Sequence, residues 1–138
     1  MSPLDTRKFK RYEVHIPVEF EFKDETLRTR FGHGKDRLRG NLFDISQGGM
    51  SIITKHFMPK GIIIKIYVKL PMKDGEESDE VKMEGDIRSV VPWKIGDNRL
   101  GIKFTNISEE NLNTIKNFIK INERRSEPRF NIRDMEEK

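Results

Sequence analysis

The stretch Tyr-Glu-Val-His-Ile-Pro-Val-Glu-Phe-Glu-Phe, residues 12–22, alternates between two kinds of side chain over its whole length. Every even-numbered position is apolar, whereas the odd-numbered positions hold Glu13, His15, Pro17, Glu19 and Glu21. This alternation predicts a β-strand with one buried face, because successive side chains of a strand point to opposite sides. Since proline has no backbone N–H for a neighbouring strand, we expect this stretch at a sheet edge, a bulge or a barrel corner.

Further strand patterns follow along the chain. We expect strands at about 38–45, 50–55, 61–70, 81–91 and 99–104, separated by turn-forming segments. Residues 24–37 are polar and basic, and we expect a long loop there. Because no helical pattern separates the six strands, their order predicts an antiparallel closed barrel or a sandwich.

One helix is expected after the last strand. Ser108 is a suitable N-cap, and Glu109 and Glu110 follow in the first turn, where the helix dipole favours acidic residues. Apolar residues then recur at helical spacing, at Leu112, Ile115, Phe118 and Ile119. Such a stripe favours packing on its own domain over packing on a partner subunit. Residues 123–138 are almost entirely polar and charged, and we expect a flexible tail.

Composition excludes several classes of protein. A chain of 138 residues without cysteine predicts one domain that needs no disulfide. The absence of a signal segment and of a long apolar run predicts a soluble cytoplasmic protein with no membrane association. No pair of histidines has metal-ligand spacing, and no nucleophile elbow or phosphate-binding loop is present. We therefore expect no catalytic residues, no metal and no cofactor.

Two short motifs lie among these expected strands. Arg7 and Arg11 form Arg-x-x-x-Arg before the first strand, and Asp44, Ser46 and Gly49 form Asp-x-Ser-x-x-Gly between the second and third. Arginine binds phosphate as a planar fork and reads the O6/N7 edge of guanine, while a carboxylate accepts from the donor edge of the same base. Each motif alone is a weak signal of a binding site. Arginines flank strands in many soluble proteins as solvated charges, and Asp and Ser are common in ordinary turns. Together they indicate a site for an anionic guanine nucleotide.

In the order and separation of these motifs the chain resembles the PilZ domain family, a bacterial receptor module for cyclic di-GMP. The resemblance covers roughly residues 5–104 and the following helix, and residues 100–104 are similar to the family's closing strand. It implies a six-stranded antiparallel β-barrel with one C-terminal helix. We accordingly divide the chain into an N-terminal ligand-binding arm at 1–11, a barrel with its helix at 12–122, and the charged tail.

The resemblance also implies the residues of the site. The ligand-binding residues would be Arg7, Arg11, Asp44, Ser46, Gly48 and Gly49, with Lys8 and Lys10 as accessory contacts. Gly48 and Gly49 are also expected to supply the positive φ angles of a tight turn. Trp93 is expected to cover one end of the barrel, with stacking on a base as the alternative. A second Arg-x-x-x-Arg, formed by Arg125 and Arg129, is open to three interpretations: coincidence, a contribution to a ligand site, or docking on a partner.

These features predict a non-enzymatic receptor that binds cyclic di-GMP and signals to a downstream protein, with motility or biofilm formation as implied outputs. The sequence does not specify whether one or two ligand molecules bind. It does not specify either whether the protein is a monomer or a dimer. The first alternative is a small basic barrel that binds single-stranded nucleic acid; the net charge of +4 favours it, but the strands lack a row of exposed aromatics. The second alternative is a protein-interaction adaptor with a silent nucleotide site.

Overall fold

The computed structural model describes residues 12–31 and 36–136, with side chains over 13–31 and 36–123. Six strands are present, and each lies where the sequence pattern predicts one, within three residues at either end. The strands are β1 (Tyr12–Phe22), β2 (Leu38–Ile45), β3 (Gly49–Thr54), β4 (Ile63–Val68), β5 (Val81–Pro92) and β6 (Asn98–Ile107). The helical elements are α2 (Glu25–Arg30), the short 3-10 helix η1 (Lys73–Gly75) and α3 (Glu109–Glu136).

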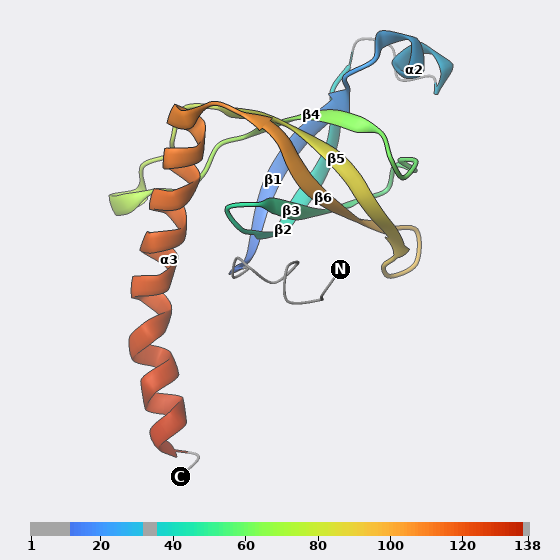
Figure 1. Cartoon of the computed structure of the whole chain (residues 1–138). Helices are drawn as coiled ribbons and strands as arrows, with labels where there is room; N and C mark the ends of the chain where they lie inside the picture. The colour runs from blue at the N-terminus through green and yellow to red at the C-terminus, as the bar shows by residue number, and fades with distance from the viewer. Residues whose placement is uncertain (1–11, 32–35, 137–138) are drawn as a thin grey trace, which may run out of the picture.

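The strands form a closed antiparallel barrel in the order β1-β2-β3-β6-β5-β4, which confirms the predicted barrel (Figure 1). Strand β1 pairs with β2 from Tyr12 to Phe20, but its register with β4 begins only at Val18. Pro17 therefore lies just outside the segment that β4 pairs, while it stays in register with Asn41 of β2.

From Val14 onward, the even-numbered residues of β1 point into the barrel, as the alternation predicts. Val14, Ile16, Val18, Phe20 and Phe22 are all buried. They pack in one apolar core with the inward-facing residues of the other strands. The pattern of β1 thus specifies both the strand and the face that it buries.

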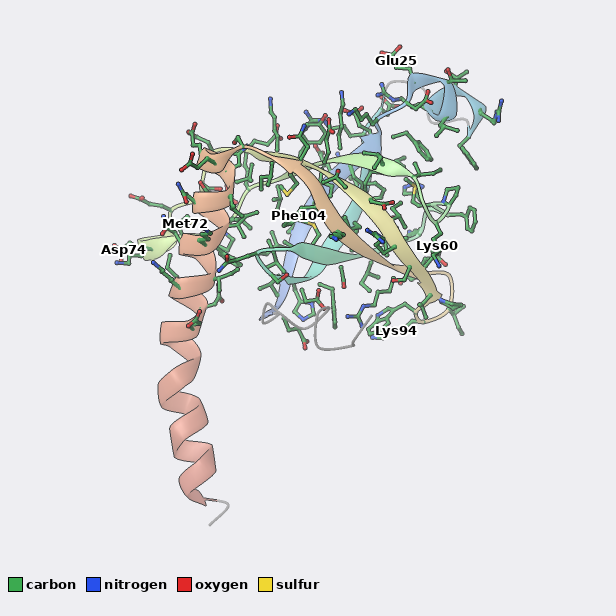
Figure 2. The ribbon with its side chains drawn as sticks, viewed as in Figure 1. Glu25, Lys60, Met72, Asp74, Lys94 and Phe104 are labelled. Carbon is green, nitrogen blue, oxygen red and sulfur yellow. The ribbon has the colours of Figure 1, made fainter. Side chains whose placement is uncertain are left out.

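Helix α3 begins beside one end of the barrel and extends away from it (Figure 1). The Ser108 hydroxyl accepts from the backbone N–H of Asn111 at 3.1 Å, which confirms the predicted N-cap. Ile115, Phe118 and Ile119 are buried in the same core as the strands. The apolar stripe therefore packs on its own domain. Figure 2 shows Met72 and Asp74 on the α3 side of the barrel and Lys60 and Lys94 on the far side.

Two helical segments differ from the expectation. The segment 24–37, expected to be a loop, contains α2, so that expectation is wrong over Glu25–Arg30, whereas the predicted C-terminal helix is present as α3. Asp24 is its N-cap, because its Oδ1 accepts from the N–H of Thr26 at 2.8 Å. Helix α3 continues to Glu136, through residues that we expected to form a tail. These residues are rich in Glu and Arg, which have high helix propensity, although Pro128 among them has low propensity. The division into arm, barrel and tail stays a prediction.

Candidate functional site

The predicted site residues Asp44, Ser46, Gly48 and Gly49 lie together where β2 turns into β3. Arg7, Lys8, Lys10 and Arg11 lie outside the described residues, and so do the side chains of Arg125 and Arg129. The first described residue, Tyr12, pairs with Ile45, and Glu13 pairs with Asp44. The described part of the chain therefore begins directly beside Asp44.

Ser46 builds the turn between β2 and β3. Its backbone N–H donates to the carbonyl oxygen of Gly49 at 2.9 Å, and its hydroxyl accepts from the N–H of Gly48 at 3.2 Å. The carbonyl of Gly48 in turn accepts from the N–H of Phe104 on β6 at 2.9 Å. These bonds attach the turn to a neighbouring strand, so this wall of the site has a fixed shape.

Gly48 and Gly49 do not have positive φ angles, so that prediction is wrong. The structure gives a different reason for glycine at position 49. A Cβ atom there would lie 2.1 Å from the backbone carbonyl oxygen of Ile102 on β6. Glycine is required because β3 and β6 approach closely at this point. The predicted role of Gly49 toward a ligand stays a prediction.

Asp44 is a buried acid, with 9% of its side chain exposed. The pairing of β2 with β3 shifts register between Leu42 and Asp44, and Asp44, Ile45 and Ser46 are consecutive buried residues. This irregularity interrupts the usual alternation and turns a polar side chain toward the protein. The Oδ2 atom of Asp44 accepts from the Nη2 atom of Arg99 at 2.9 Å.

Arg99 is a further residue of the candidate site that neither motif includes. It lies on β6 immediately before the segment 100–104 that resembles the family's closing strand. Its guanidinium carbon is 4.9 Å from the centre of the Phe43 ring and 5.1 Å from that of Trp93. These two rings are themselves 5.2 Å apart at an angle of 62°. Trp93 therefore packs beside the candidate site on Phe43 and Arg99.

A second polar cluster lies between β1 and β4. The Arg37 guanidinium is 3.5 Å from the centre of the Tyr67 ring and pairs with Glu19 at 3.1 Å and Glu80 at 3.0 Å. The Tyr67 hydroxyl donates to Glu21. Burial, followed by this hydrogen bond, raises the pKa of Tyr67 to about 12. The cluster joins the segment before β2 to β1, β4 and the segment before β5.

A groove of about 660 Å³ lies beside this cluster, where β1 extends past the end of β4. Its walls include His15, Pro17, Arg39 and Tyr67. Across the two described ranges, no group of three or more acidic or histidine side chains is arranged to hold a metal ion. No helix in those ranges has the length and apolar character needed to cross a membrane.

Comparison with known families identifies this architecture. The model of the PilZ domain matches residues 5–120. The chain belongs to the PilZ domain family. The resemblance drawn from the two motifs is therefore confirmed. No curated protein matches this PilZ chain in sequence.

Solved structures with the same fold include the Bacillus subtilis inhibitor of motility MotI/DgrA, with a TM-score of 0.64 and 13% identity, covering 84% of this chain and 51% of that one. Escherichia coli YcgR in complex with c-di-GMP has a TM-score of 0.63 and 18% identity, covering 91% and 49%. The PilZ domain of YcgR with c-di-GMP has a TM-score of 0.60 and 19% identity, covering 91% and 97%. This PilZ chain thus spans about half the length of MotI/DgrA and YcgR.

Proposed function

We propose that this chain is a non-enzymatic receptor for cyclic di-GMP. The ligand binds between the arm that carries Arg7 and Arg11 and the wall formed by Asp44, Ser46 and the Gly48–Gly49 turn. Membership of the PilZ family and the c-di-GMP named in the YcgR structures support this proposal. The observation that carries it is the pairing of Glu13 with Asp44, which joins the arm to the barrel beside a buried carboxylate.

The chemistry of the two sides is complementary to the ligand. Cyclic di-GMP has two phosphates and two guanines, so it offers anionic oxygens, acceptor edges and donor edges. The guanidiniums of Arg7 and Arg11 bind phosphate or the O6/N7 edge of guanine. The Asp44 carboxylate accepts from the N1–H and N2–H donors of guanine. Lys8 and Lys10 add positive charge beside the phosphates.

Binding also supplies the signal. A ligand held by both the arm and the wall fixes the arm against the barrel and creates a joint surface. A downstream protein binds that surface and so responds to the presence of the ligand. Contacts that exist only in the bound form give the partner its differential affinity. A cytoplasmic location and the absence of metal and cofactor belong to the same proposal.

Isothermal titration calorimetry with cyclic di-GMP tests this function. We expect the wild-type chain to bind, and Arg7→Ala and Arg11→Ala each to lose about 1–3 kcal/mol of binding free energy. Arg88→Ala is the matched control, because Arg88 pairs with Asp86 and its side chain is 58% exposed. Circular dichroism should show the same fold for all variants.

Two results would contradict the proposal. The first is wild-type affinity in both arm variants, which would remove the arm from the site. The second is the absence of binding to cyclic di-GMP combined with tight binding to single-stranded oligonucleotides. Affinity that grows with oligonucleotide length and falls steeply with salt would identify the nucleic-acid alternative.

A further inference from the structure

Arg99 is held within the candidate site from two directions. On one side, its Nη2 atom donates to the Asp44 carboxylate at 2.9 Å. On the other, its guanidinium lies in the angle between the Phe43 and Trp93 rings, 4.9 and 5.1 Å from their centres. A cation against two aromatic faces is attracted to both, so these contacts restrict where the long side chain can lie.

The contact with Arg99 stabilises the Asp44 carboxylate more than it stabilises Arg99 itself. Only 9% of the Asp44 side chain is exposed, whereas 33% of Arg99 is exposed. An acid this far removed from water needs a charged or hydrogen-bonding partner, because the loss of hydration is costly. The other bond of Arg99 to the described residues, with the Ser51 hydroxyl at 3.5 Å, is long and therefore weak. The bond to Asp44 thus dominates the polar contacts of Arg99.

We propose that Arg99 is a positioning residue that fixes the orientation of the Asp44 carboxylate for ligand recognition. Phe43 and Trp93 restrict the position of the Arg99 guanidinium, and the guanidinium fixes the orientation of the Asp44 carboxylate by its hydrogen bond. The carboxylate then accepts from the guanine donors without first having to reorient. A group that is ordered before binding avoids the entropy cost of being ordered by the ligand. This inference rests on the proposed function, since it assigns the ligand contact to Asp44.

A double-mutant cycle measures whether Arg99 acts through Asp44. Calorimetry with cyclic di-GMP compares the wild type, Arg99→Gln, Asp44→Asn and the variant that carries both changes. We expect Arg99→Gln to weaken binding about tenfold, which corresponds to about 1.4 kcal/mol. In the Asp44→Asn background the same change should weaken binding by less than about twofold.

Two further variants separate this role from a general loss of charge or stability. Arg88→Gln removes a positive charge from the exposed side chain that pairs with the partly buried Asp86 on the adjacent strand β5, and should bind as tightly as the wild type. Arg99→Lys keeps a positive charge near Asp44 but lacks the planar fork. It should recover part of the affinity that Arg99→Gln loses.

Trp93 is the only tryptophan of the chain, so its fluorescence reports on this contact without any ligand. If Asp44 and Arg99 hold each other, both Arg99→Gln and Asp44→Asn should change the emission of Trp93. Arg88→Gln should leave it unchanged. Unaltered emission in Asp44→Asn would overturn the proposed coupling even if no ligand binds.

Three binding results have distinct meanings. Wild-type affinity in Arg99→Gln overturns the positioning role and leaves the proposed function intact. If Arg99→Gln lowers the affinity equally in the wild type and in Asp44→Asn, the positioning role is also overturned. Arg99 would then contact the ligand directly or act through the fold. A wild-type chain that binds no cyclic di-GMP overturns the proposed function itself, together with the recognition role that depends on it.

Discussion

Replacing Gly49 with alanine tests the close approach of β3 to β6 beneath the candidate site. The added Cβ would lie 2.1 Å from the carbonyl oxygen of Ile102, whereas real Cβ atoms essentially never come closer than 3.0 Å to such an atom. It would also lie 3.1 Å from the carbonyl carbon of Ile102 and 3.3 Å from the Cα of Lys103. All three atoms are backbone, so no side-chain rotation relieves the contact.

The magnitude follows from two opposing effects. Overpacking typically costs about 1–3 kcal/mol, and a clash with backbone belongs at the upper end of that range. Alanine also restricts the unfolded chain, which contributes about 0.4–1 kcal/mol of stability wherever the native φ is acceptable. Since Gly49 has no positive φ, this second effect applies. We therefore expect Gly49→Ala to lower the free energy of unfolding by about 2 kcal/mol.

Urea denaturation followed by circular dichroism measures this loss. Gly101→Ala is the matched control, because its Cβ would lie 2.3 Å from the Ser89 hydroxyl oxygen, which can rotate away. We expect that variant to remain within about 0.5 kcal/mol of the wild type. Equal destabilisation by the two substitutions would refute the reasoning, because the distinction between backbone and side-chain neighbours would then have no effect.

Two further predictions concern the rest of the barrel. The pKa of Tyr67 is raised from 10.0 to about 12, so the stability that comes from its neutral hydroxyl is fully present below pH 10 and is lost as the pH rises toward 12. Between pH 9 and pH 11 the wild type should therefore lose more unfolding free energy than Tyr67→Phe, and parallel declines in denaturation experiments would contradict this. Asp24→Ala removes the N-cap of α2 and should lower stability by about 1 kcal/mol, whereas Asp24→Ser should restore most of it. If the serine variant is as unstable as the alanine variant in urea, the cap is not the cause.

Local sequence patterns predicted the strands well where a strand buries one face, as β1, β4 and the first part of β5 do. The alternation of β1 identifies its range and its inward residues, and both agree with the structure. Helix α2 was missed because it has six residues and no fully buried side chain, so apolar periodicity does not reveal it. Its detectable signal was Asp24, an N-cap residue followed by Glu25. Helix α3 extends past the apolar stripe, which ends at Ile119, because Glu and Arg residues of high helix propensity follow it.

The candidate site could be predicted only in part, because some of its residues are far apart in the sequence. The Asp-x-Ser-x-x-Gly motif lies within one turn, so its residues are neighbours in both sequence and space. Arg99 is 55 positions from Asp44 and reaches it through the pairing of β2 with β3 and of β3 with β6. That pairing depends on strand order and register, which a single sequence does not specify. The structural reason for glycine at position 49 could not be predicted for the same reason, because the atom that excludes a Cβ belongs to β6.

The strand order also has a consequence for synthesis of the chain. Strand β6 is the last to leave the ribosome, yet it lies between β3 and β5 in the finished barrel. Until it is inserted, the sheet has two unpaired edges, Asp44 lacks its arginine, and the turn at Gly48 lacks the bond from Phe104. A nascent chain that stops short of β6 therefore has neither a closed barrel nor the complete candidate site. The barrel and the Asp44–Arg99 contact are expected to form together, once β6 has been inserted between β3 and β5.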